Sequence, residues 1–202
     1  ISRIAKQQED PAEEAKEWKQ RLNKNGARGY EKILDPKGPK LSSTHIPPSK
    51  TKVVVDVPLN KQCEFMLDTT KCKLYDSYYN GTQQFADLTK YFNYEADCRP
   101  KENDQEVTTQ SRLLHMKYKG FLVVGPRDFF YLSSFKKLSP TLIIVATVSV
   151  DHEAFPSFKD HTRGFMGFSG CILQAVSDTQ TSVTNIADID LKGLVMRFSQ
   201  SS

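Results

Sequence analysis

The chain consists mainly of short β-prone segments separated by turn residues, and this alternation constrains the fold more than any other feature. Representative segments are KVVVDVP at 52–58, FFYLSSFKK at 129–137 and LIIVATVSV at 142–150. Residues 85–97 and 106–119 read as one long hairpin, and residues 163–176 and 181–190 as a final one. About eight or nine strands are predicted in all, mostly in meander order.

Helical spacing is confined to three segments. The first extends from Asp10-Pro11 to Asn25-Gly26, with an acidic first turn, a basic last turn and four apolar residues on one face. Residues 59–68 have the spacing of a second helix, and residues 71–79 form a short third helix or a loop. We therefore predict an N-terminal helix within residues 1–25 that packs on the sheet, and a single domain whose body is residues 26–202.

So few helices cannot cover both faces of the predicted sheet. The expected fold class is α+β, with a curved antiparallel sheet that either closes as a barrel or wraps around a hydrophobic cavity between sheet and helices. A cavity of this kind would favour a ligand that avoids water.

The charge pattern and the cysteine spacing argue against several classes of protein. The 28 basic and 24 acidic residues, net +4, are spread along the chain without the dense basic stripe that nucleic-acid binding requires. The longest apolar run, residues 142–150, has about half the roughly 18 residues of a membrane-spanning helix. The four cysteines lack the C-x-x-C spacing of zinc or redox sites. No nucleic acid, metal or cofactor is therefore expected.

Catalytic motifs are also missing from the sequence. The segment Gly167-Phe168-Ser169-Gly170-Cys171 lacks the final glycine of a nucleophile elbow, and neither a phosphate-binding loop nor a dinucleotide fingerprint is present. The three histidines His115, His152 and His161 have no recognisable nucleophile beside them. We expect a protein that is not an enzyme, with catalysis on a hydrophobic substrate and a purely structural role as the alternatives.

Four segments, in order, resemble the START family, the StAR-related lipid-transfer domains, whose members bind lipids in a helix-grip fold. These segments are VDVPLNKQCEFMLDTTKCKLYD, GFLVVGPRDFFYL, FPSFKDHTRGFMGFSGCIL and NIADIDLKG. They correspond to the family's W-D, P-R-D-F, V-R-G and D-x-x-G regions and span residues 52–193. The resemblance implies that the chain binds one lipid in an internal cavity and transfers it between membranes.

The sequence departs from this family in two places. Tyr75 stands where the family usually has Trp, directly before Asp76. The family also continues after D-x-x-G into a long C-terminal helix that covers the cavity, whereas this sequence stops at Ser202. We expect a shortened lid, which would favour pairing of two chains or another cover over the opening.

The resemblance also indicates candidate site residues. Those expected to bind lipid are Lys71, Tyr75, Asp76, Met116, Tyr118, Arg127, Phe129, Tyr131, Arg163 and Phe165. Met116, Tyr118 and Phe129 have matching parity near the centres of their strands and are the best candidates for the cavity wall. Arg127 and Asp128 also fit a structural ion pair, and Arg163 could pair with Asp128 or Asp76. Phe155 and Phe158 are predicted to form a gate that inserts into the membrane, or to pack inward against the lid.

The lipid class follows from the same comparison of residues. Sterol-binding members carry an acidic and a basic residue at the positions that match Leu74 and Ser133, so that charge pair is missing here. Lys71 and Lys73 lie close to where phosphatidylcholine-binding members place a basic residue for the phosphate, and the position that aligns with it is Cys72. A glycerophospholipid such as phosphatidylcholine is therefore favoured, and sterol transfer or lipid sensing is the alternative. We expect a cytoplasmic protein with transient membrane contact, although the sequence also leaves secretion open.

Overall fold

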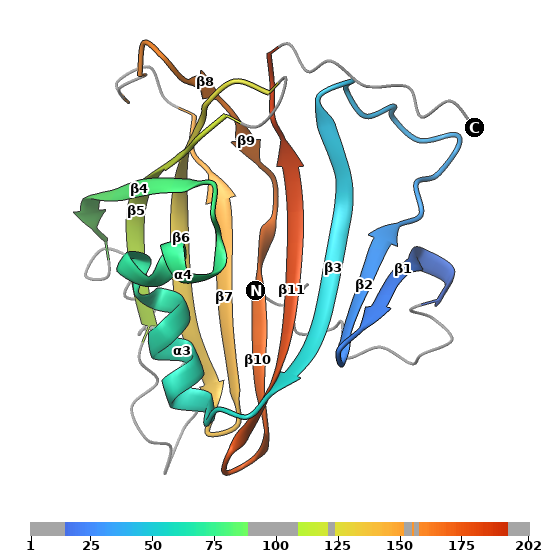
Figure 1. Ribbon diagram of the computed structural model, residues 1–202, viewed down its shortest axis with the longest axis vertical. Helices are drawn as coiled ribbons and strands as arrows, with labels where there is room; N and C mark the ends of the chain where they lie inside the picture. Colours follow the sequence, from blue (N-terminus) through green and yellow to red (C-terminus); the bar gives the residue numbers. More distant parts are fainter. Residues whose placement is uncertain (1–14, 89–108, 121–123, 152–154, 156–157, 194–202) are drawn as a thin grey trace, which may run out of the picture.

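The computed structural model describes residues 15–88, 109–120, 124–151, 155 and 158–193 (Figure 1). The strands are β1 (Trp18–Lys24), β2 (Ala27–Lys32), β3 (His45–Val55), β4 (Tyr79–Asp87), β5 (Thr109–Tyr118), β6 (Arg127–Ser139), β7 (Leu142–Ser149), β8 (Thr162–Arg163), β9 (Phe165–Met166), β10 (Ser169–Ser177) and β11 (Gln180–Asp190). The helices are α3 (Leu59–Leu67), the 3-10 helix η1 (Thr69–Lys71) and α4 (Cys72–Tyr75). Within these residues no helix is long and apolar enough to cross a membrane.

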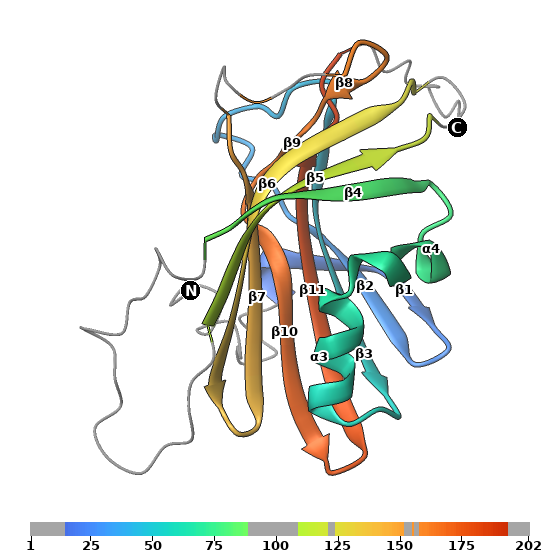
Figure 2. The same cartoon turned by 90° about the vertical axis from the view of Figure 1, so that its left-hand side faces the viewer.

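The strands form one sheet in the order β1-β2-β3-β11-β10-β7-β6-β5-β4, and all neighbours along this path are antiparallel. The short strand β8 pairs in parallel with β6, and β9 pairs with β11. Figure 2 shows the sheet from the side, curving around α3 and α4, which lie on its concave face. The predicted curved antiparallel sheet with few inserted helices is confirmed.

Helix α3 is held on the concave face by apolar side chains. Its Leu59 and Cys63 are buried in a cluster with Ile143, Val145, Cys171, Leu173 and Val183 from β7, β10 and β11. Burial raises the pKa of the Cys63 thiol to about 11 and that of Cys171 to about 12, so both are neutral at pH 7. This cluster is the main core, and it fixes α3 over the middle of the sheet.

Residues Trp18–Lys24 form strand β1, and the prediction that the N-terminal helix reaches residue 25 is wrong for this segment. Asn25 and Gly26 both have positive φ values, 52° and 75°, and Lys24 pairs with Ala27. That geometry is the two-residue turn that Asn-Gly favours in β-hairpins. The same dipeptide also suits a helix end, which explains the error. The part of the predicted helix within residues 1–14 lies outside the described residues.

Helix α3 matches the predicted helix at 59–68, and β5 matches the predicted strand at 106–119. Its partner β4 begins at Tyr79, six residues before the predicted strand at 85–97, so the predicted first strand of that hairpin starts too late in the sequence. Pro47 and Pro48 lie within β3, where β2 no longer pairs and β11 has an irregular register between Ala187 and Ile189. Prolines are tolerated at such positions because they remove no ladder hydrogen bond. Residues 89–108 and the expected shortened lid after residue 193 lie outside the described residues.

Candidate functional site

A second apolar cluster lies on the concave face, away from α3. Leu114, Phe129 and Tyr131 are buried in it, and the residues packed against them are Met116, Tyr118, Met166, Ile189 and Leu191. We call these eight residues the inner cluster. The register of β5 and β6 pairs Met116 with Phe129 and Leu114 with Tyr131, so alternate residues of the two strands share one face. Four of the predicted lipid-binding residues are therefore brought together here.

The polar atoms of the inner cluster are hydroxyls without charge. The ring of Tyr118 meets Phe129 edge to face at 5.7 Å between centroids, and its hydroxyl donates to Met116 Sδ at 2.7 Å. Burial raises the pKa of both Tyr118 and Tyr131 far above the usual value for tyrosine. Both side chains are therefore neutral at pH 7, and the cluster carries no charge.

Tyr75 belongs to the helical side of this region. Its hydroxyl lies 3.1 Å from Cys72 Sγ, and its ring centroid lies 5.8 Å from that of Phe65. Cys72 is buried, whereas most of the Tyr75 side chain remains exposed. Burial of the hydroxyl end raises the pKa of Tyr75, so this residue adds another neutral group.

Arg127 is buried, and its guanidinium group donates hydrogen bonds to backbone carbonyl oxygens. It donates to the carbonyl oxygens of Leu191 at 2.7 Å, Lys192 at 3.0 Å and Gly125 at 2.8 Å. These bonds join the start of β6 to the end of β11. The predicted ion pair between Arg127 and Asp128 is wrong, because Arg127 binds backbone carbonyls and Asp128 pairs with Arg163.

Asp128 faces the opposite side of the sheet, where it forms a buried ionic network. Its Oδ2 accepts from His115 Nε2 at 2.6 Å and from Arg163 Nε at 2.9 Å. The predicted pairing of Arg163 with Asp128 is confirmed. Burial lowers the pKa of His115 even though Asp128 opposes this shift. A neutral His115 ring can donate to Asp128 through Nε2. It needs no positive charge of its own, because Arg163 already forms an ion pair with this carboxylate.

Phe155 and Phe158 pack on this same convex face. Phe155 stacks on Phe130 with centroids 4.0 Å apart, and Phe158 stacks on His115 at 4.6 Å. The Lys117 ammonium lies 3.7 Å from the centre of the Phe158 ring. Neither ring faces the inner cluster in this arrangement. The predicted inward packing of Phe155 and Phe158 therefore differs from the structure, where both rings pack on the convex face.

Three further candidates lie outside the inner cluster. Phe165 pairs with Asp190 and Met166 with Ile189, so within β9 it is Met166 that joins the cluster. Lys71 forms an ion pair with Asp68 at 3.4 Å. Asp76 accepts a hydrogen bond from the Tyr78 amide at 2.9 Å and lines a polar depression described next.

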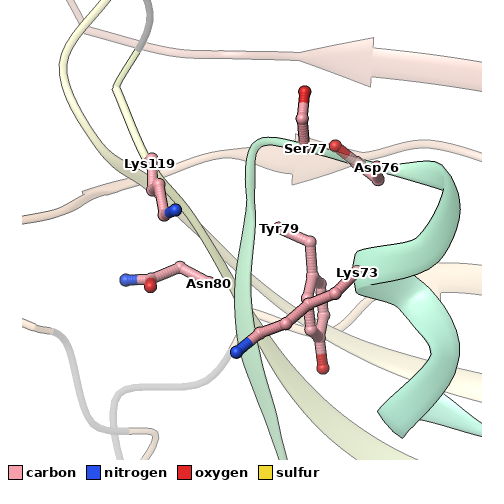
Figure 3. A pocket seen from close by; sticks show the side chains of 6 residues that line it. All are labelled: Lys73, Asp76, Ser77, Tyr79, Asn80 and Lys119. Carbon is pink, nitrogen blue, oxygen red and sulfur yellow. The ribbon is translucent and has the colours of Figure 1, made fainter.

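The polar depression lies between α4, the start of β4 and the end of β5 (Figure 3). It has a volume of about 250 Å³ and is lined by Lys73, Asp76, Ser77, Tyr79, Asn80 and Lys119. Tyr79 connects it to the inner cluster, because its buried ring meets Tyr118 edge to face at 6.4 Å. The Tyr79 hydroxyl donates to the Thr69 carbonyl at 3.0 Å and lies 2.8 Å from Thr82 Oγ1, whose hydroxyl can donate to it, and these two contacts fix the ring between the two regions.

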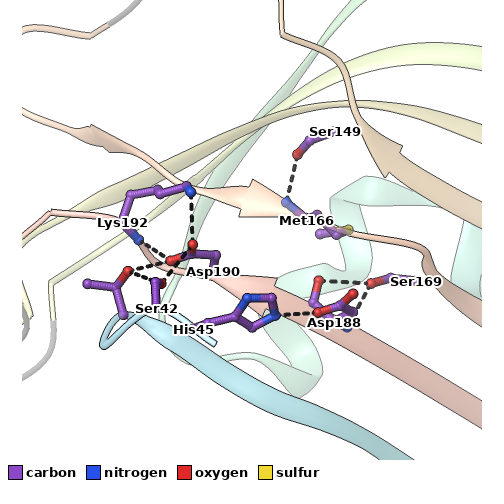
Figure 4. Close-up of polar contacts among 9 residues, drawn as sticks. Ser42, His45, Ser149, Met166, Ser169, Asp188, Asp190 and Lys192 are labelled. Carbon is purple, nitrogen blue, oxygen red and sulfur yellow. Dashed lines mark hydrogen bonds and ion pairs between the residues drawn. The ribbon is translucent and has the colours of Figure 1, made fainter. Parts of the chain in front are cut away.

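Polar contacts also fix the far end of β11 (Figure 4). Asp190 accepts from Thr44 at 2.5 Å, Ser42 at 3.1 Å and the Lys192 ammonium at 2.8 Å. Burial alone would raise the pKa of Asp190, but these hydrogen bonds outweigh it and hold the pKa well below the usual value. Asp188 binds His45 Nε2 at 2.5 Å. This end of the sheet is held by charge and hydrogen bonds, unlike the inner cluster.

Sequence reasoning missed Leu114, Met166, Ile189 and Leu191. Leu114 follows from the same parity as Met116, since both alternate with residues of the opposite face. Met166, Ile189 and Leu191 could not be found this way, because they depend on the pairing of β9 with β11. In the part of the chain that the structure describes, no group of three or more His, Cys, Asp or Glu could hold a metal ion.

Comparison with solved structures shows which known proteins share this fold. No curated protein matches the sequence significantly. Human STARD10 is similar with a TM-score of 0.73 and 17% identity, over 96% of this chain and 67% of that one. Human StAR-related lipid transfer protein 5 has a TM-score of 0.67 and 18% identity, over 97% and 81%. The lipid transfer and protein localization domain of human StarD13 (DLC2) has a TM-score of 0.64 and 17% identity, over 96% and 82%.

The family itself is established from the sequence, since at these identities the structures support the fold alone. The profile of the START domain matches residues 3–197, which is nearly the whole chain. The curved sheet and inserted helices agree with that match, and so do the structural neighbours. On these grounds, the chain belongs to the START domain family.

Proposed function

We propose that this domain binds one lipid molecule, with the acyl chains against the inner cluster, and carries it between membranes. START domains are lipid-binding and transfer domains, and the family model matches nearly the whole chain. The observation that carries the proposal is the inner cluster itself. It is apolar and uncharged, and it lies on the concave face beside the region that α3 covers.

The physical requirement for transfer supports this assignment. Moving an acyl chain out of a bilayer costs about 0.8 kcal/mol for each CH₂ group that becomes exposed to water. A carrier avoids this cost only if its binding surface is as apolar as the membrane interior. The aromatic and methionine side chains of the inner cluster meet that requirement, and the neutral hydroxyls of Tyr75, Tyr118 and Tyr131 add polarity without charge.

We further infer that the lipid is a glycerophospholipid, such as phosphatidylcholine, and not a sterol. Ser133 is a buried neutral residue of β6, at the position where sterol-binding members carry a basic residue. By the alternation of β6 it shares the face of Phe129 and Tyr131. Ser133 itself therefore offers the ligand no charge, and Arg112, its register partner on β5, donates to the Leu67 carbonyl at 3.1 Å. In this proposal a single domain works in the cytoplasm and touches membranes transiently.

Charge placed on the inner cluster tests the proposal directly. Met116→Glu and Phe129→Asp should abolish most lipid transfer between liposomes, because an unpaired charge against acyl chains costs several kcal/mol. Lys137→Glu and Val176→Asp are the controls, since both lie outside the inner cluster and Val176 is exposed on β10. Thermal melting must confirm that each variant folds.

Bound lipid is measured separately from transfer. The purified protein is extracted with organic solvent, and the lipid is identified and quantified by mass spectrometry. We expect one glycerophospholipid per chain in the wild type and much less in Met116→Glu. Equal lipid content and equal transfer rates in all four variants would remove the inner cluster from the function, and a sterol in the extract would overturn the inferred lipid class.

A further inference from the structure

The polar depression of Figure 3 is lined by two lysines, Lys73 and Lys119, and by one carboxylate, Asp76. Among the described residues neither Lys73 nor Lys119 forms an ion pair through its ammonium group. Lysines elsewhere do form such pairs: Lys71 with Asp68, Lys61 with Glu64 and Lys192 with Asp190. The depression therefore has cationic groups that can bind an anion.

Asp76 reduces this charge without cancelling it. One of its carboxylate oxygens is engaged by the Tyr78 amide at 2.9 Å. Two ammonium groups and one carboxylate leave one net positive charge in the depression. Ser77 and Asn80 add a hydroxyl and an amide, which can donate hydrogen bonds to a phosphate oxygen. In Figure 3 Lys73 extends from α4, and Lys119 from the end of β5, toward the side of β4 that carries Asn80.

Apolar side chains lie beside these lysines. Leu74, the residue after Lys73, is 75% exposed and is the most exposed large apolar side chain in the described part of the chain. Tyr78 is 41% exposed and lies next to the Ser77 of the depression. A surface with exposed Leu and Tyr side chains among lysines is suited to membrane binding. The apolar groups insert into the bilayer interface, and the ammonium groups bind anionic head groups.

The depression also adjoins the proposed lipid site. Tyr79 lines it on one side and contacts Tyr118 of the inner cluster on the other. A membrane bound at the depression would therefore be separated from the inner cluster by a single aromatic ring. Phe155 and Phe158 do not lie next to the inner cluster, because they stack on the opposite face of the sheet.

We propose that Lys73, Lys119 and Leu74 form the surface by which the domain docks on bilayers that contain anionic phospholipids, with a lipid phosphate held in the depression between the two lysines. The biological purpose of docking rests on the proposed transfer function. The docking itself does not, since it uses residues outside the inner cluster.

The test is cosedimentation of the whole chain with vesicles of phosphatidylcholine, with and without phosphatidylserine. We expect stronger binding to the anionic vesicles, and a loss of that preference as the salt is raised from about 0.1 M to about 1 M. The double variant Lys73→Gln and Lys119→Gln should lower the partition coefficient on anionic vesicles about 30-fold, since each lysine near such a surface contributes about fivefold. Leu74→Ser should weaken binding to both kinds of vesicle.

The matched control is the double variant Lys24→Gln and Lys37→Gln, which removes the same charge from two exposed positions, the last residue of β1 and the turn after β2. All these positions are exposed or line the depression, so folding should persist, and a melting curve checks it. If the two double variants bind anionic vesicles equally, or if the wild type shows no anionic preference, the docking surface is refuted.

Lipid content separates this proposal from the proposed function. Docking variants that keep their bound lipid but lose vesicle binding and transfer support the docking surface. A wild type that contains no lipid, yet binds anionic vesicles through Lys73 and Lys119, refutes the transfer function and leaves the docking surface intact.

Discussion

The substitution Asp128→Asn should reduce stability more than any other carboxylate-to-amide change on the convex face. Asp128 is fully buried, and its Oδ2 accepts hydrogen bonds from both His115 and Arg163. The amide has almost the same shape but no negative charge. The amide oxygen can still accept from both residues, with the NH₂ group in the place of Oδ1, which has no hydrogen-bond partner, but Arg163 loses its ion pair with the carboxylate.

The expected cost follows from burial. Removing one partner of a buried ion pair costs about 3–5 kcal/mol, because the remaining charge is left uncompensated. The Arg163 side chain is 28% exposed, so water can solvate part of it, and we expect a loss near 3 kcal/mol. The control is Glu31→Gln. Its pair with Arg21 also has a 3.0 Å contact, but the side chains are 41% and 51% exposed, so the loss should stay below about 1 kcal/mol.

Urea unfolding followed by circular dichroism measures both losses. For a domain of this size each kcal/mol lowers the melting temperature by about 2–4 °C, so Asp128→Asn should melt roughly 6–12 °C below the wild type. Glu31→Gln should melt within about 4 °C of it. If the two variants lose the same free energy of unfolding, burial is not what makes the Asp128 network important, and the reasoning is wrong.

Two further predictions concern the pH dependence and the backbone. Because burial lowers the pKa of His115, the folded protein resists a proton that the unfolded chain accepts near the ordinary pKa of about 6.5. Stability should therefore be complete above pH 7 and fall as the pH drops below 6.5, and urea titrations of His115→Gln should show a weaker fall over the same range. Gly170 has φ +149°, and a methyl group there would overlap the Val145 carbonyl oxygen, so Gly170→Ala should cost about 3 kcal/mol or more. A melting temperature unchanged in Gly170→Ala would contradict this close approach of the two strands.

The sequence predicts the sheet well where local pattern and pairing agree. The alternation in β5 and β6 correctly places Met116, Tyr118, Phe129 and Tyr131 on one face, because side chains in paired strands must alternate. Helix α3 is predictable for the same reason, since its buried residues recur with helical spacing.

The errors occur where pairing partners, and not local pattern, decide the structure. Trp18–Lys24 has helical spacing, but the turn at Asn25-Gly26 and the pairing with β2 make it a strand. The sequence favours Phe165 over Met166, because only the pairing of β9 with β11 decides which residue of β9 faces the inner cluster. The buried network of Asp128 likewise depends on β5, β6 and β8 meeting in space.

The pairing of β3 with β11 has a consequence for the order in which this chain can fold during synthesis. Val55 pairs with Thr181 and His45 with Asp190, so the first three strands have no neighbour on that side until the final strand has been made. At roughly 5–20 residues per second, a ribosome needs many seconds to synthesise the segment between them. Throughout that time the edge of β3 exposes unpaired backbone groups, and Pro47 and Pro48 shorten the stretch that could pair with another chain. The same pairing that completes the sheet thus leaves an open strand edge on any chain that folds its first three strands before β11 is made.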